Sequence, residues 1–247
     1  MSSVAIYQKE AWYDLVSAWR TPGFVLPALA FPVVFYLFFG VLFSPAGSSH
    51  AAYMLVTYSC FGIMGPAMFN FAMNIASDRA QGWLTLKRLS PMPVSAYLLA
   101  KMATSLVFAM LIIVLLFSVA AVFGDVRLEQ GQWLGLALLL LAGTVPFALI
   151  GLLLGLTLSD KAAPGVVNLL YLPMAFLSGL WLPIHLLPQF LQQLAWVWPS
   201  YHLSQLGLKL LAMDQGQPLL HLVILGLTTA VLMGLCVLVF RRYTGAK

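Results

Sequence analysis

The sequence predicts an all-α polytopic membrane protein: six transmembrane helices, an N-terminal interfacial helix, and short re-entrant helices between spans five and six. Of its 247 residues, 62% are hydrophobic and only 8% are charged, and the mean hydropathy is +0.97. A soluble domain carries about 25% charged residues, so this chain cannot cover a water-exposed surface. Its apolar residues also form runs of about twenty, the length that crosses a bilayer. Residues 1–247 are therefore interpreted as one transmembrane domain.

The expected elements follow these apolar runs in order. Residues 4–20 place Trp12 and Trp19 on one helical face and Glu10 and Asp14 on another, which is typical of a helix lying in the membrane interface. Thr21, Pro22 and Gly23 then turn the chain into the first span. The six spans are expected at about residues 24–43, 53–76, 94–123, 133–158, 164–181 and 219–240, the fifth being marginal in length.

The orientation of the spans follows from the Lys and Arg residues in alternate loops. Ten lie on one side and two, Arg127 and Lys209, on the other. Cytoplasmic loops carry the excess of basic residues, so both termini are predicted to lie in the cytoplasm. The protein is expected in the plasma (inner) membrane of a bacterial cell. Lys101, just inside the third span, is expected to snorkel back to the cytoplasmic surface.

Residues 182–218 do not fit a simple outer loop. Several large apolar side chains, such as Phe190 and Trp198, are unsuited to open water, yet residues 188–198 would form a helix only about 16 Å long. Pro199 then separates this stretch from the next apolar residues. This segment is interpreted as a pair of short re-entrant or interfacial helices; the alternative is an aromatic belt flanking an ordinary loop.

Enzyme chemistry is not indicated. The histidines are scattered towards the predicted outer side without metal-ligand spacing, and no phosphate-binding Gly-rich loop occurs. No acidic residue is expected at mid-membrane depth, where ion-driven carriers usually need one. The basic residues form no stripe, so a nucleic-acid partner is not expected. The expected partners in the bilayer are membrane lipids. This chain is expected to bind no cofactor and no metal.

The cytoplasmic loop of residues 77–93 has the features of a docking element. Asp78 can cap a short helix, Trp83, Leu86 and Leu89 lie near one face, and Pro91 ends it. A short helix with cations and an aromatic side chain suits a cytoplasmic partner. The alternative is a loop that merely obeys the positive-inside rule.

With these features, the sequence resembles the ABC type-2 permeases, the transmembrane subunits of ATP-binding-cassette exporters. The resemblance covers nearly the whole chain. It rests on the interfacial N-terminal helix, on Asp78-Arg79 followed by Gly82, Leu84, Leu89 and Pro91, and on residues 177–184 with Leu187-Pro188 after them. Pro199 and Tyr201 come next, as a proline and an aromatic residue do in many members of the family. The chain departs from the family pattern at Ala80 and at Gly82-Trp83.

The resemblance implies a dimer of permease subunits, here expected to be a homodimer, each engaging a separate ABC ATPase subunit that binds ATP and Mg²⁺. The implied coupling residues on loop 77–93 are Asp78, Arg79, Gly82, Trp83, Leu86, Lys87, Arg88, Leu89 and Pro91. An outer gate is implied at Leu180, Trp181, Pro183, Leu187 and Pro188. The expected function is an exporter permease for an amphipathic, drug-like or lipid-like substrate.

Two further features concern the span interiors. Phe61, Met64, Met68, Phe69 and Asn70 form a candidate substrate-facing surface on the second span, although such a stripe is more often helix packing. Gly151 and Gly155 have the G-x-x-x-G spacing of a close helix contact. Alternative functions are an ion-coupled carrier, or a membrane enzyme or assembly factor with a site at Asn70, Asn74, Asn168 and Tyr171.

Overall fold

The computed structural model describes residues 3–83, 86, 93–213 and 216–244, most of which are helical, with no strand among them. The helices are α1 (Ser3–Trp19), α2 (Pro22–Tyr36) with its π-helical continuation η1 (Leu37–Leu42), α3 (Ser49–Ala80), α5 (Val94–Val122), α6 (Gln130–Thr157), α7 (Ala163–Leu177), the 3₁₀ turn η2 (Ile184–Leu186), α8 (Gln189–Ala195), α9 (Pro199–Leu210) and α10 (Pro218–Thr244).

Within the described residues, five helices are long and apolar enough to cross a membrane: α2 with η1, α3, α5, α6 and α10. This confirms the all-helical architecture with several candidate membrane spans. Helix α7 has 15 residues, so it is about 22 Å long against a hydrocarbon core of about 30 Å. A sixth full crossing therefore stays a prediction, as does the re-entrance of α8 and α9.

Helix α7 is shorter than predicted because Gly179 ends it. Gly179 has φ +74°, a conformation that favours glycine. The amide of Gly179 donates to the carbonyl of Phe176, and that of Leu180 donates to Ala175, both at 3.1 Å. These two bonds form a Schellman motif, which satisfies the last carbonyls of the helix and turns the chain towards η2.

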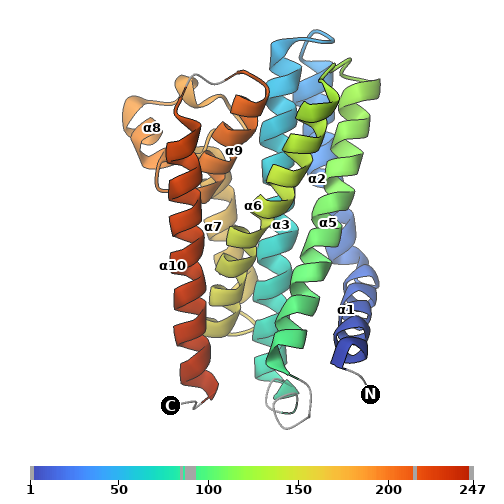
Figure 1. The fold of residues 1–247 in the computed structure, drawn as a ribbon, viewed down its shortest axis with the longest axis vertical. Helices are drawn as coiled ribbons and strands as arrows, with labels where there is room; N and C mark the ends of the chain where they lie inside the picture. The colour runs from blue at the N-terminus through green and yellow to red at the C-terminus, as the bar shows by residue number, and fades with distance from the viewer. Residues whose placement is uncertain (1–2, 84–85, 87–92, 214–215, 245–247) are drawn as a thin grey trace.

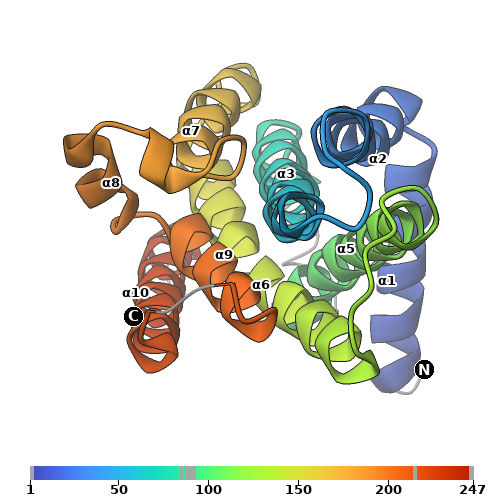
Figure 2. The same ribbon diagram turned by 90° about the horizontal axis from the view of Figure 1, so that it is seen from above.

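Helix α3 runs through the middle of the bundle, with α2, α5, α6 and α7 around it (Figure 2). It is the most buried of the long helices and the least apolar, because it faces protein rather than lipid. The described start of α1 and end of α10 lie at one end of the bundle, which we call the inner end (Figure 1). Helices α8 and α9 lie towards the opposite, outer end.

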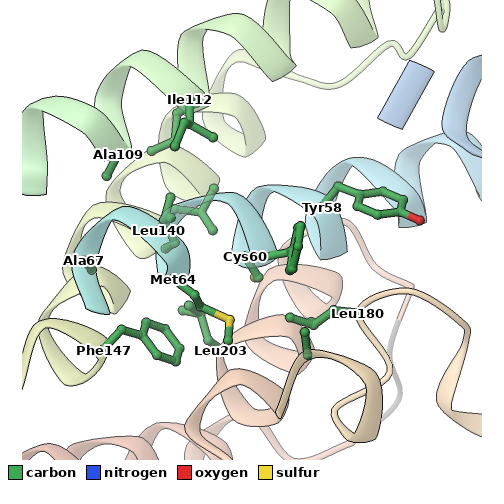
Figure 3. Close-up of a cluster of buried hydrophobic side chains, with 14 of the residues drawn as sticks. Tyr58, Cys60, Met64, Ala67, Ala109, Ile112, Leu140, Phe147, Leu180 and Leu203 are labelled. Carbon is green, nitrogen blue, oxygen red and sulfur yellow. The ribbon is translucent and has the colours of Figure 1, made fainter. Parts of the chain in front are cut away.

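The core forms where α3 meets α6 and α9. Met64 of α3 is fully buried in a cluster that includes Phe147 of α6 and Leu203 of α9 (Figure 3). A Cβ added at Gly151 would touch the backbone of Met68, and one added at Gly155 would lie 2.9 Å from the carbonyl of Ala72. The predicted close helix approach at these glycines is therefore confirmed, between α6 and α3.

The expectation that Lys101 reaches the surface is wrong. Its side chain is only 4% exposed, and Nζ lies 2.7 Å from Oδ1 of Asp14, which is 13% exposed. The hydroxyl of Thr104 donates to the other carboxylate oxygen at 2.7 Å. Lys101 turns inward because α1 supplies this acid, and the resulting ion pair fastens α1 to α5 near the inner end.

Candidate functional site

Helices α2, α3 and α7 enclose a groove of about 640 Å³. Among the described residues that line it, none carries a charge, and the only amide side chain is that of Asn168. Aromatic side chains dominate the lining: Phe24, Phe31, Phe35, Phe61, Phe69, Tyr171 and Trp181. A mostly apolar concave surface with a few polar groups is what small-molecule sites in proteins usually present.

Aromatic contacts hold the three walls of the groove together. The Phe61 ring of α3 stacks on Tyr171 of α7, with centroids 5.0 Å apart, and meets Trp181 edge-on at 5.5 Å. Trp181 also stacks on Phe35 of α2 at 6.2 Å. The Tyr171 hydroxyl donates to the Phe61 carbonyl at 3.2 Å, beside Gly65, where a side chain would crowd it. These contacts fix the shape of the groove.

The structure divides the predicted substrate-facing stripe. Phe61 and Phe69 line the groove, whereas Met64 and Met68 are fully buried in the core. Asn70 donates to the Lys101 carbonyl and to the Ser105 hydroxyl of α5, both at 3.2 Å. At 3.6 residues per turn these positions point to different sides of α3, so one helix face cannot hold them all.

The groove also contains residues that the sequence interpretation did not assign to it. Phe24, Phe31 and Phe35 share one face of α2, and their spacing of seven and four residues was the available signal. The polar set proposed for a membrane enzyme divides in two: Asn168 and Tyr171 line the groove, whereas Asn74 donates to Asn70 at 2.7 Å. The four side chains therefore do not share one site.

At the inner end, α3 continues to Ala80, so Asp78 lies in its last turn and does not cap a new helix. That part of the sequence interpretation is wrong. Oδ2 of Asp78 accepts a hydrogen bond from the Tyr97 hydroxyl of α5 at 2.6 Å. Nη1 of Arg79 donates to the carbonyls of Gly155 at 2.9 Å and Leu158 at 3.2 Å, at the end of α6.

Beyond this point the chain turns at Gly82, which has φ +76°. Trp83 is 50% exposed and Leu86 is 57% exposed. Two apolar side chains of the predicted docking face thus reach the surface at the inner end. The other predicted coupling residues, Lys87, Arg88, Leu89 and Pro91, lie outside the described residues.

At the outer end, the predicted gate residues follow α7. Leu180 is fully buried in the core cluster (Figure 3), and Trp181 reaches the groove. Pro183 and Pro188 stand directly before η2 and α8, and Leu187 is buried. The hydroxyls of Ser178 and Ser200 lie 2.6 Å apart, and Tyr53 of α3 donates to the Gly179 carbonyl at 3.3 Å. The segment is thereby joined to both α9 and α3.

A buried pair of histidines also lies near the outer end. Nδ1 of His202 is 2.8 Å from Nδ1 of His221, and Nε2 of His202 is 2.8 Å from the Trp196 carbonyl. Since a carbonyl only accepts, Nε2 of His202 carries a proton and its Nδ1 accepts one from His221. Burial lowers the pKa of His202 from the usual 6.5.

Acidification should therefore destabilise the protein through His202. Its folded-state pKa lies below the unfolded one, so its stabilising contribution is present above about pH 6.5 and is lost as the pH falls below that value. The unfolding temperature in detergent should be lower at about pH 5.5 than at about pH 7.5, and His202→Gln should reduce this drop. His185→Gln, at an exposed position, is the control and should leave the drop unchanged. An equal drop in His202→Gln would assign the effect to other groups.

Two comparisons with known proteins bear on the groove and its two ends. A family model described as "ABC-2 type transporter" matches residues 8–212, which run from α1 to the end of α9. The chain is 31% identical over 200 residues to "Putative transport permease YvfS" of Bacillus subtilis (strain 168). That alignment covers 80% of this chain and 82% of the Bacillus protein.

Proposed function

Because this chain belongs to the ABC-2 type transporter family, we propose that it is the permease subunit of an ATP-driven exporter of amphipathic, drug-like or lipid-like compounds. The observation that carries this proposal is the charge-free aromatic groove between α2, α3 and α7. Aromatic side chains offer large apolar contact areas, and Asn168 adds a polar group that can orient an amphipathic molecule.

Export needs an energy source, and we assign it to a separate ABC ATPase subunit that binds ATP and Mg²⁺. This chain itself is proposed to be non-enzymatic. Trp83 and Leu86 present an exposed apolar surface at the inner end, next to a predicted basic segment. An aromatic anchor of this kind is typical of the residues that dominate binding at protein interfaces. The ATPase is therefore proposed to dock here, with the inner end in the cytoplasm of a bacterial cell.

A second copy of the chain is proposed to complete the pathway. The side chains of Phe31 on α2 and Leu172 on α7 line the groove and are exposed. A homodimer that faces two such grooves towards each other would enclose the substrate. Residues 180–188 would then close the outer end, because they follow directly from the groove wall at Trp181.

The test is to co-express the chain with the ATPase encoded beside its gene and to purify the complex through the permease. Wild type should recover the ATPase, and the double variant Trp83→Ala/Leu86→Ala should lose it. A single interface anchor contributes about 2 kcal/mol or more, and neighbouring anchors do not add fully, so the affinity of the double variant should fall at least about 30-fold. The control is Leu134→Ala/Phe190→Ala, which removes two exposed apolar side chains from the outer half of the molecule.

Three outcomes would contradict the proposal in different ways. If wild type recovers no ATPase, the assignment as an ABC exporter subunit fails. If the double variant retains the ATPase at wild-type levels, the docking surface lies elsewhere. Transport that continues after ATP depletion would instead favour an ion-coupled carrier.

A further inference from the structure

Asp78 and Arg79, the charged pair expected to contact the ATPase, both engage partners inside this chain. The Tyr97 hydroxyl donates to the Asp78 carboxylate at 2.6 Å, and Arg79 donates to two carbonyls of the α6 terminus. The pair thus ties the last turn of α3 to the start of α5 on one side and to the end of α6 on the other. A guanidinium also suits this place electrostatically, because the last carbonyls of a helix carry partial negative charge.

The carbonyls that Arg79 holds belong to the end of α6, and one short turn separates this end from α7. Leu158 caps α6, and α7 begins at Ala163. The intervening turn is itself hydrogen-bonded: the amides of Ala162 and Ala163 donate to the Ser159 carbonyl at 3.1 and 2.9 Å. Because this turn is short and hydrogen-bonded, the end of α6 that Arg79 contacts has little freedom to move independently of the first residues of α7.

Helix α7 in turn forms one wall of the groove. Asn168 and Tyr171 line it, and Tyr171 is bonded and stacked to Phe61 of α3. A displacement of the α3 terminus relative to the bundle would thus pull the start of α7 through Arg79. A few residues further on, and among the residues of this loop that the structure describes, Trp83 and Leu86 offer exposed apolar side chains to a docking partner.

We propose that Asp78 and Arg79 form an internal clamp that transmits movement of the docking element to α7, rather than a contact with the ATPase. This proposal rests on the proposed function. Arg79 is a positioning residue in it: the side chain acts on the groove only through the α6 terminus and the turn before α7. The clamp predicts that docking and groove movement can be separated by mutation.

The experiment uses the full-length permease purified with its ATPase and reconstituted in lipid vesicles. Spin labels at Leu26→Cys on α2 and Leu169→Cys on α7, both exposed positions, report the distance across the groove. The native Cys60 and Cys236 are buried and should stay unlabelled. Distances are compared without nucleotide and after trapping with ATP, Mg²⁺ and vanadate.

Wild type is expected to show a nucleotide-dependent distance shift. Arg79→Gln should retain the ATPase subunit and ATP hydrolysis but lose the shift, and Arg79→Lys, which keeps the charge and one donor group, should restore part of it. Lys161→Gln removes an exposed cation from the same inner end and should behave as wild type. Tyr97→Phe, which removes only the hydroxyl on Asp78, should reduce the shift even if Arg79→Gln cannot be purified.

Three results would overturn the clamp. Loss of the ATPase from Arg79→Gln would make Arg79 a contact with that subunit. An unchanged shift in both Arg79→Gln and Tyr97→Phe would show that neither bond transmits the movement, and no shift in the wild-type complex would show that α7 does not move. A wrong assignment of function is distinguishable, because wild type would then recover no ATPase at all.

Discussion

Replacing Lys101 with Met should destabilise the protein by about 3–5 kcal/mol, the effect seen when one partner of a buried ion pair is removed. The ammonium lies 2.7 Å from Asp14, and both side chains are largely shielded from solvent. Met fills a similar volume but leaves the Asp14 carboxylate without its cation, held by the Thr104 hydroxyl. The bond from Asn70 to the backbone carbonyl of Lys101 is unaffected, so the loss reports the Lys101 charge, which faces Asp14 and also lies 4.9 Å from the centroid of the Tyr97 ring.

Unfolding of the purified protein by a denaturing detergent, followed by tryptophan fluorescence, measures this loss. The double variant Asp14→Asn/Lys101→Met removes both charges and should recover most of the stability, because no buried charge is left unpaired. Lys161→Met, at an exposed position, should change stability by less than about 0.5 kcal/mol. A Lys101→Met protein as stable as wild type would mean that Asp14 and Lys101 contribute no net stability as a pair.

The positions of the long helices could be predicted because a bilayer constrains both length and composition. Each predicted span corresponds to a helix, yet α3 extends beyond its predicted residues 53–76 at both ends. Its first turn is capped by Ser48, whose hydroxyl accepts from the Ala51 amide, and its last turn contains Asp78 and Arg79. Polar turns like these lie outside the apolar run, so hydropathy alone cannot include them.

The groove could be predicted only in part because it is assembled from three helices. Phe61 and Phe69 were identified from α3 alone, but their neighbours on α2 and α7 depend on how the helices pack. The same limit explains why the Asp14–Lys101 pair was not predicted, since nothing local in the sequence places residue 14 beside residue 101. It also explains why the contacts of Arg79 were not predicted, because the two acceptors described here are backbone carbonyls, which no residue type in the sequence indicates.

Gly151→Ala should destabilise the protein although alanine is the better helix former. A Cβ at this position would meet the backbone of Met68 on α3, and backbone cannot move aside as a flexible side chain can. Overpacking of this kind costs about 1–3 kcal/mol after partial relaxation, which outweighs the gain of up to about 1 kcal/mol in helix propensity. The helices α3 and α6 would have to separate, which would also disturb the α6 terminus that Arg79 holds.

Gly226→Ala in α10 is the matched control, because a Cβ there has no neighbour within 4 Å. It should be neutral or stabilising by up to about 1 kcal/mol, so of the two glycine-to-alanine changes only Gly151→Ala is expected to destabilise the protein. The same detergent unfolding assay compares them. If Gly151→Ala proved as stable as Gly226→Ala, the close contact between α3 and α6 would not be a determinant of the stability of the fold.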